Sequence, residues 1–268
     1  MTDMPASLAA HDVVDRYEVV RSHIDDAARA AGRSPEEVRL LPVSKTVPAE
    51  ALVADWEALQ ARSESAGRDE CLWLAENRVQ EAAAKAAHFA EHFATAATGH
   101  QPQWVVIGPL QTNKAGQLVE FASEFQALDR PKVAAALQRR LAAAERSLDV
   151  LIQVNSSEEP QKAGVALDAV EGFVEQFGPA GDYPNLRLRG FMTMAMKSDG
   201  TPAGEASVRR CFEKVRVLRD ELVAKCPDGV TLDELSMGMS GDYELAIAEG
   251  ATTVRVGQAI FGARPPAV

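Results

Sequence analysis

Short apolar segments alternate with stretches of helical periodicity along the whole chain, and this alternation most constrains the fold. Apolar runs of about four to eight residues bounded by turn residues are typical of buried parallel strands. Eight such runs are predicted, at 40–46, 71–76, 104–108, 125–129, 149–155, 186–194, 231–237 and 252–256. Helices are predicted between them, at 48–60, from 77 onward, and at 111–121, 131–146, 166–177, 206–226 and 242–249, after an N-terminal helix at 6–31.

This repeat in a chain of 268 residues predicts an α/β fold, a closed (β/α)8 barrel with an extra N-terminal helix. The most linker-like segment, 197–204, is too short for a domain boundary, so we expect one domain over residues 1–268 with a core over 6–262. A doubly wound open sheet is the alternative. No Gly-x-Gly-x-x-Gly motif follows the first strand, which disfavours a dinucleotide site.

Composition narrows the classes of partner. Lys and Arg number 28 against 39 Asp and Glu, and a net charge of -11 opposes binding to nucleic acid. Cys71, Cys211 and Cys226 are far apart, which indicates neither a disulfide framework nor a zinc site and fits a cytoplasmic protein. Residues 1–10 lack a signal-peptide pattern and no apolar run reaches about 18 residues, so we expect no membrane association.

Lys45 ends the first predicted strand, within the segment Leu-Leu-Pro-Val-Ser-Lys-Thr. The carboxyl ends of parallel strands are where α/β folds place their chemistry. A lysine amine at that edge can attack a carbonyl carbon and form a Schiff base. The alternative is a lysine that only extends into solvent.

Two turns near the last strands, 236–241 and 257–259, are candidates for a phosphate site. Their small residues let backbone N–H groups approach an anion closely, and serine hydroxyls add donors. Such a site would suit a phosphate monoester. The alternative is that Gly238 and Gly257 only permit tight turns.

Arg255 is a charged residue inside the apolar last strand, so it needs a partner if it enters the barrel. An ion pair with Glu244 or Glu249 is one possibility. A hydrogen bond to a ring nitrogen of a bound cofactor is the other. A Schiff-base lysine, a phosphate site and an arginine inside the barrel together point to pyridoxal phosphate.

Five segments, in order, closely resemble the YggS/PROSC family of pyridoxal phosphate homeostasis proteins. They are residues 42–46, 76–81, 107–114, 235–240 and 254–257, and the likeness extends over about 6–262. The resemblance implies a barrel like the N-terminal domain of bacterial alanine racemase, with pyridoxal 5'-phosphate held as a Schiff base on Lys45.

The resemblance also implies roles for individual residues. Arg255 would face the pyridine nitrogen, and Asn77 and Asn155 would line the pocket. The phosphate would be held by Ser236, Ser240 and the backbone of Met237, Gly257 and Gln258. The chain departs from the family pattern where the family usually has a tyrosine, here Arg78, and where it usually has a histidine, here Val105. The missing histidine leaves the third strand's contribution to the pocket open.

These features favour a binding protein over an enzyme. An arginine at the ring nitrogen weakens the ring as an electron sink, and a racemase needs a second acid or base opposite the lysine. None of Tyr17, Tyr183 and Tyr243 lies at a strand end, and His88 and His92 fit a solvated helix face better than a metal site. We therefore expect a monomeric protein, without catalytic or metal-binding residues, that stores pyridoxal phosphate and delivers it to apoenzymes. An amino-acid racemase using this cofactor and a Schiff-base aldolase are the alternatives.

Overall fold

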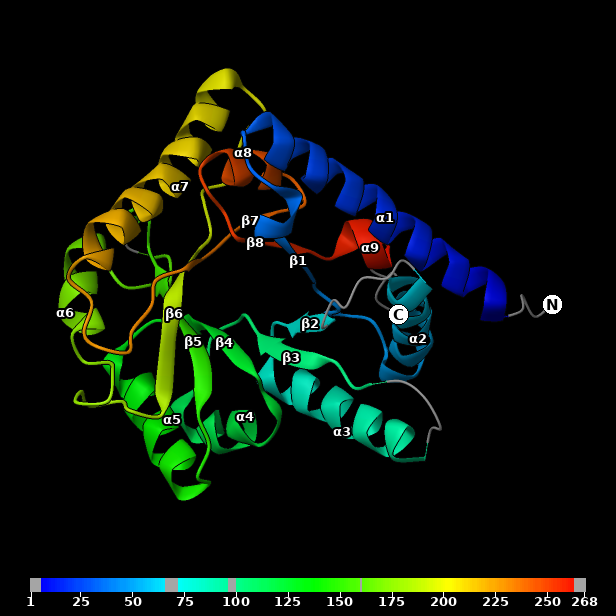
Figure 1. The fold of residues 1–268 in the computed structure, drawn as a ribbon, viewed down its shortest axis with the longest axis horizontal. Coiled ribbons are helices and arrows are strands. Elements are labelled where there is room, and N and C mark those ends of the chain that lie inside the picture. Colours follow the sequence, from blue (N-terminus) through cyan, green and yellow to red (C-terminus); the bar gives the residue numbers. More distant parts are fainter. Residues whose placement is uncertain (1–5, 66–71, 96–99, 160, 263–268) are drawn as a thin grey trace.

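The eight predicted strands form one parallel sheet in the computed structural model, which describes residues 6–65, 72–95, 100–159 and 161–262 (Figure 1). The sheet order is β1-β8-β7-β6-β5-β4-β3-β2, so consecutive strands are neighbours and the last strand returns to the first. The strands are β1 (Arg39–Pro42), β2 (Trp73–Glu76), β3 (Gln103–Val106), β4 (Glu124–Leu128), β5 (Leu148–Val154), β6 (Leu186–Thr193), β7 (Glu234–Met239) and β8 (Thr253–Val256). The predicted (β/α)8 topology is confirmed.

The barrel is nearly closed. In the described part of the chain, β1 and β2 share a single parallel bridge, between Val43 and Ala75, whereas β1 pairs along its whole length with β8. The bridge lies at the carboxyl end of the two strands. The seam between β1 and β2 is therefore joined at that end and lacks a ladder at the other.

Helices surround the strands, and α1 lies beside α2, α8 and α9 (Figure 1). They are α1 (Ala6–Ala30), α2 (Ala49–Ser65), α3 (Val79–Thr95), α4 (Ala115–Phe121), α5 (Pro131–Ala143), α6 (Val170–Val174), α7 (Pro202–Val223), α8 (Tyr243–Ala248) and α9 (Gln258–Phe261). Short 3-10 turns are η1 (Pro35–Glu37), η2 (Thr112–Lys114) and η3 (Leu167–Ala169). None of the described helices combines the length and apolar character that crossing a bilayer requires.

Several predicted boundaries were wrong. Helix α7 starts at Pro202 rather than 206, because the Thr201 side chain accepts a hydrogen bond from the Gly204 N–H and caps the first turn. Strand β7 starts and ends later than predicted and includes Gly238 and Met239. The predicted helix 166–177 is reduced to η3 and α6, and α2 extends to Ser65. Cys71, predicted to open the second strand, lies outside the described residues.

Successive side chains of a strand point to opposite faces, which separates the barrel interior, or lumen, from the helix layer. Leu40 packs in the main core with α1, on the helix side. The lumen side of the first three strands is an apolar cluster of Leu41, Val43, Ala75 and Val105. Ser44 continues the alternation onto the helix side, where its hydroxyl contacts Glu76, and the chain then turns at Lys45.

Candidate functional site

The carboxyl ends of β1, β8 and β7 are adjacent in the sheet and bring three of the predicted segments together. Lys45 follows β1, Gly257 follows β8 and Ser240 follows β7. Gly257 lies directly against the first strand, since a Cβ added to it would be 2.9 Å from the Val43 carbonyl oxygen. The chain thus gathers the lysine and both predicted phosphate turns at one end of the barrel.

Lys45 is exposed and, among the described residues, makes no hydrogen bond or ion pair. The residue before it, Ser44, is fully buried, and the residue after it, Thr46, has a φ of 75°. A β-branched residue is rarely found in that conformation. The lysine therefore projects from a constrained backbone, and its side chain is exposed.

Arg255 is buried in the lumen, where its side chain is held by three oxygens. Its Nη1 donates to the Ser236 carbonyl oxygen at 2.7 Å and to Ser236 Oγ at 2.8 Å, and its Nη2 donates to the Thr193 carbonyl oxygen at 2.9 Å. Burial lowers the pKa of Arg255 to about 10, opposed by the nearby Asp242 carboxylate. The guanidinium remains charged at neutral pH.

The ion pair considered for Arg255 does not form. Glu249 instead pairs with Arg209 and Arg216 on the surface, and Glu244 is an exposed residue of α8. The reason is the alternation in β8, which turns Arg255 into the lumen while those glutamates belong to the helix layer. A guanidinium has five N–H donors, so donors remain beyond the three hydrogen bonds found.

A chain of polar side chains crosses the lumen behind Arg255. Ser236 Oγ donates to Gln126 Oε1 at 2.7 Å, and Gln126 in turn donates to Glu124. Arg39 binds Glu124 through two hydrogen bonds of 3.0 Å each. Burial by itself would lower the pKa of Arg39. The opposing effects, chiefly the charge and hydrogen bonds of the Glu124 carboxylate, are together larger than this effect of burial, so the pKa of Arg39 is raised. The Ser236 hydroxyl is therefore engaged by Gln126 and Arg255.

At the predicted phosphate turn after β7, Ser240 is exposed and borders a cavity of about 530 Å³ between this turn and the loop before α7. Met239 N–H donates to Asp242 Oδ1 at 2.6 Å. Gly238 has a φ of 94°, and a Cβ there would come within 2.8 Å of Tyr243 Cα. Met237 is buried in the core and Gln258 is exposed. The close packing against Tyr243 explains why a glycine is needed at position 238. The phosphate-binding roles of Ser236, Met237, Ser240, Gly257 and Gln258 stay predictions.

The two predicted pocket asparagines follow β2 and β5. Asn77 is exposed, whereas Asn155 is tied into its own loop through a hydrogen bond from Nδ2 to the Glu159 carbonyl oxygen at 3.0 Å. Of the two departures from the family pattern, Val105 is fully buried in the apolar lumen cluster and Arg78 is exposed beside Glu81. The histidine position of the family therefore faces the lumen here as an apolar side chain.

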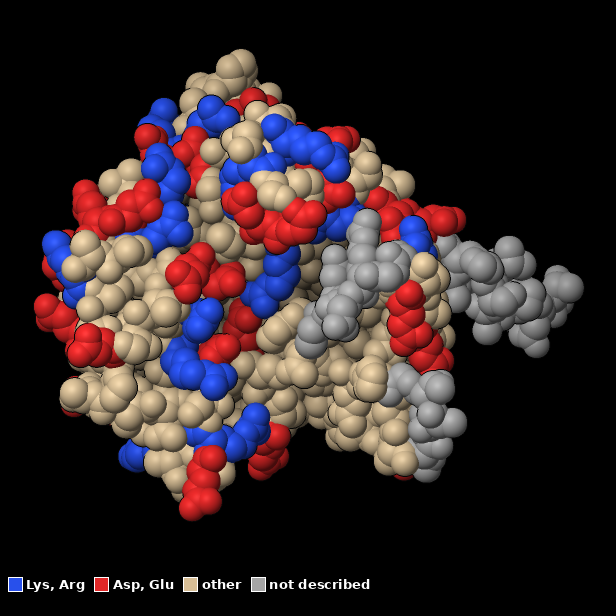
Figure 2. Space-filling view, viewed as in Figure 1, with Lys and Arg blue, Asp and Glu red and all other residues tan. Residues whose placement is uncertain are grey.

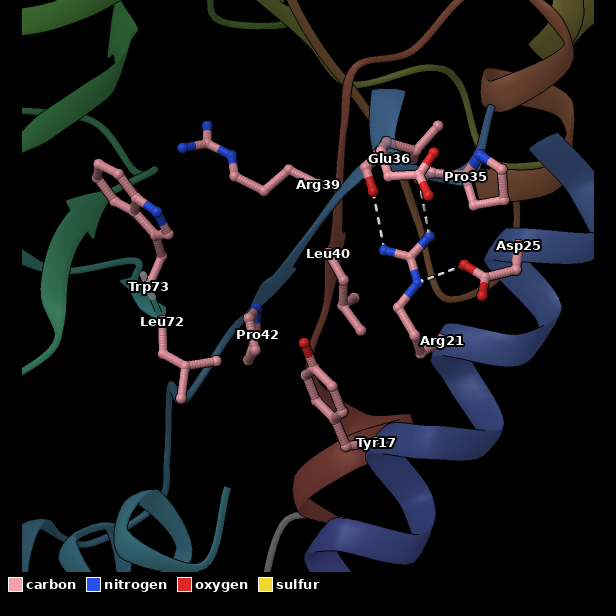
Figure 3. A pocket seen from close by; sticks show the side chains of 11 residues that line it. Tyr17, Arg21, Asp25, Pro35, Glu36, Arg39, Leu40, Pro42, Leu72 and Trp73 are labelled. Atoms are coloured by element: carbon pink, nitrogen blue, oxygen red, sulfur yellow. Dashed lines mark hydrogen bonds and ion pairs between the residues drawn. The ribbon is translucent and has the colours of Figure 1, made fainter. Parts of the chain in front are cut away.

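A cavity of about 470 Å³ lies at the opposite, amino end of the β1–β2 seam (Figure 3). Trp73 and Arg39 border one side, with the Arg39 guanidinium 5.0 Å from the ring centre, and Tyr17 and Arg21 of α1 border the other. Arg21 is paired with Asp25 at 2.7 Å. Both cations already have carboxylate partners, so we do not assign the cofactor to this cavity.

Acidic and basic side chains are interspersed on the face shown in Figure 2, and that face has no extended basic area. No group of three or more His, Cys, Asp or Glu side chains in the described ranges is placed to hold a metal ion. His92 lies beside Glu57 at 2.9 Å on an exposed helix face.

Sequence reasoning missed a second polar group, which lies directly beneath Lys45. Ser44 Oγ donates to Glu76 Oε1 at 2.6 Å, and Lys85 Nζ of α3 contacts both the same oxygen and the Ser44 carbonyl. It also missed Gln126 and Thr193. The alternation Glu-Phe-Gln in a buried strand was the available signal for Gln126. No local pattern identifies Lys85. Its partner Glu76 lies nine residues earlier in a strand, whereas Lys85 lies in the following helix.

Comparisons with known proteins agree with this fold. Residues 21–265 match the family model described as alanine racemase, N-terminal domain. The chain is 40% identical over 253 residues to the pyridoxal phosphate homeostasis protein of Vibrio alginolyticus, covering 94% of this chain and 97% of that protein. It is 38% identical over 254 residues to the Escherichia coli K12 protein of the same name, covering 95% and 97%.

Among solved structures, PipY of Synechococcus elongatus with PLP bound superposes with a TM-score of 0.70 at 29% identity, covering 93% of this chain and all of that one. The family model covers residues 21–265, a range that contains all eight strands of the barrel. The chain belongs to the family of pyridoxal phosphate homeostasis proteins, whose barrel is that of the N-terminal domain of alanine racemase.

Proposed function

We propose that this protein binds pyridoxal 5'-phosphate for storage and delivery to apoenzymes, with the cofactor attached to Lys45 as a Schiff base. The observation that carries the proposal is an exposed Lys45 amine, without a partner in the part of the chain that the structure describes, at the same barrel end as the buried Arg255. The names of the relatives and the PLP-bound PipY structure support the cofactor. When bound, the cofactor supplies an aldehyde that reacts reversibly with amines.

The residues fit this group in three respects. Lys45 offers an exposed amine just beyond the carboxyl end of β1. Arg255 retains N–H donors that can reach an acceptor such as a ring nitrogen. Ser240 and Gln258 are exposed beside the turns that end β7 and β8, where a phosphate would bind. In the attachment step, the neutral Lys45 amine adds to the aldehyde carbon, and the aldehyde oxygen leaves as water with both amine hydrogens.

The same residues favour holding the cofactor over turnover. Arg255 keeps a positive charge in the lumen, which disfavours protonation of a facing ring nitrogen. The tyrosines do not offer an evident second base: Tyr17 is on α1, Tyr183 packs against Phe173 and Phe177, and Tyr243 is buried at the start of α8. We therefore propose a non-catalytic role.

We also propose that the protein acts as a monomer in the cytoplasm. Cys211 and Cys226 are free thiols, as is usual in a reducing compartment.

The test is an absorbance titration with pyridoxal 5'-phosphate. We expect a band near about 420 nm in the wild type, as a Schiff base of this cofactor gives, and its loss in Lys45→Ala. Borohydride reduction followed by peptide mass spectrometry should place the adduct on Lys45. Lys225→Met, which removes an exposed lysine paired with Glu171, is the control and should keep the band. A colourless wild type, or an adduct that persists in Lys45→Ala at the wild-type yield, would exclude the proposal.

A further inference from the structure

Ser44, the residue before Lys45, is fixed at each of its polar atoms. Its N–H donates to the Ala75 carbonyl oxygen at 3.0 Å and its Oγ donates to Glu76 Oε1 at 2.6 Å. Its carbonyl oxygen accepts from Lys85 Nζ at 2.8 Å and from the Val47 N–H at 3.0 Å. The lysine thus extends from a residue that β2 and α3 hold in place.

The Lys85–Glu76 ion pair is buried, with Nζ 2.5 Å from Oε1 and side chains only 8% and 0% exposed. The second carboxylate oxygen of Glu76 is buried without a hydrogen-bond partner in the described chain. An ion pair in such a place is costly to desolvate, and an apolar pair of similar size commonly stabilises a fold as well. Stability alone therefore does not account for these two residues.

The location of Lys85 and Glu76 beside the β1–β2 seam indicates their role. β1 and β2 are joined only by the Val43–Ala75 bridge in the described residues, so no ladder holds the end of β1 against β2. The pair links Ser44 to both β2 and α3 one residue beyond that bridge. It also braces the backbone before Thr46, whose φ of 75° requires support from its surroundings.

We propose that Lys85 and Glu76 are positioning residues that hold the Lys45 amine where it can attack the cofactor aldehyde. This inference rests on the function proposed above. Neither residue needs to touch the cofactor, because both side chains are buried whereas that of Lys45 is exposed. Their contribution is to fix the backbone from which the amine projects.

The test compares pyridoxal 5'-phosphate with pyridoxamine 5'-phosphate, which has the same ring and phosphate but an amine in place of the aldehyde. In Lys85→Met, the rate of adduct formation at about 420 nm should fall roughly 10- to 100-fold, the range expected when a reacting group is misplaced by about 1 Å. Affinity for pyridoxamine 5'-phosphate, measured by calorimetry, should stay unchanged. Lys225→Met, which breaks an exposed pair, should alter neither quantity.

Lys85→Met leaves the Glu76 carboxylate buried without its cation, so this variant can lose its fold. The double variant Glu76→Gln/Lys85→Met removes both charges together and carries the same prediction, with circular dichroism to verify folding. Adduct formation at the wild-type rate in the folded double variant would refute the positioning role alone. Equal weakening of both ligands would refute it too, since it would indicate general damage to the pocket. A wild type without an adduct on Lys45 would refute both proposals.

Discussion

Arg255 and Asp242 illustrate how burial controls charge near the site. Arg255 is 4% exposed, and its described acceptors are backbone and hydroxyl oxygens rather than a carboxylate. Asp242 lies close enough to influence it and is itself partly buried, so each charge offsets some of the other's desolvation. An anionic ligand at this end of the barrel would bring a further negative charge toward Arg255 and would be favoured by it.

Asp242→Asn is predicted to gain stability relative to the wild type as pH rises. Burial raises the pKa of Asp242 above its ordinary value of 3.8, opposed by the Met239 N–H and by Arg255. A carboxyl whose pKa is raised by folding contributes stability that is present below 3.8 and lost as pH rises through its folded pKa. Asparagine has no such loss and can still accept from Met239. Urea unfolding at several pH values between 4 and 7 measures the difference, and a difference independent of pH would contradict the assignment.

Single glycines decide whether neighbouring elements can approach. Gly190 of β6 has a φ of 151°, and a Cβ there would lie 1.9 Å from the Glu234 carbonyl oxygen of β7. It pairs with both β5 and β7, at the point where the β5–β6 register shifts. Gly172 of α6 is the opposite case, since an added Cβ would meet nothing within 4 Å.

Alanine should therefore destabilise the protein at Gly190 but not at Gly172. Gly190→Ala would push β6 from β7 and force an unfavourable φ, so we expect a loss of more than about 2 kcal/mol in the free energy of unfolding. Gly172→Ala should be neutral or gain up to about 1 kcal/mol, because alanine favours a helix. Chemical denaturation of both variants provides the comparison. Equal effects at the two positions would show that the close approach of β6 to β7 at Gly190 does not determine the free energy of unfolding.

At the scale of the whole molecule, α1 joins the beginning and the end of the barrel. It packs against α2, α8 and α9, and Arg33, just after it, donates to the carbonyl oxygens of Ile247 at 3.1 Å and Ala251 at 2.8 Å. Tyr17 and Arg21 of the same helix border the amino end of the β1–β2 seam (Figure 3). The helix thus covers the part of the barrel that strand pairing leaves open.

Ile24→Ala on α1 should lower the free energy of unfolding by about 2–4 kcal/mol, the usual cost of a cavity in a packed core. Ile24 is fully buried, whereas Val19 on the same helix is 56% exposed. Val19→Ala is the matched control and should change stability by less than about 0.5 kcal/mol. Midpoints of urea unfolding would measure both. A small effect of Ile24→Ala would mean that the barrel does not depend on α1.

The sequence by itself determined the number, order and parallel arrangement of the strands. Apolar runs with strand periodicity and helices between them leave few other ways to bury the chain. It also located Lys45 and Arg255 at the ends of strands that a barrel must bring together. The roles of the phosphate and asparagine residues stay predictions, because the sequence and the fold do not by themselves determine ligand contacts.

Only the tertiary structure decided which side chains meet. Gln126 reaches Ser236 across 110 residues and Lys85 reaches Ser44 across 41, and no local pattern encodes such pairs. The ion pair that was one of the two alternatives for Arg255 does not form for the same reason, since strand alternation turns Arg255 away from Glu244 and Glu249. The nearly closed seam also emerged only in three dimensions. Periodicity reports which face of an element is buried, whereas partners depend on how faces from distant segments pack.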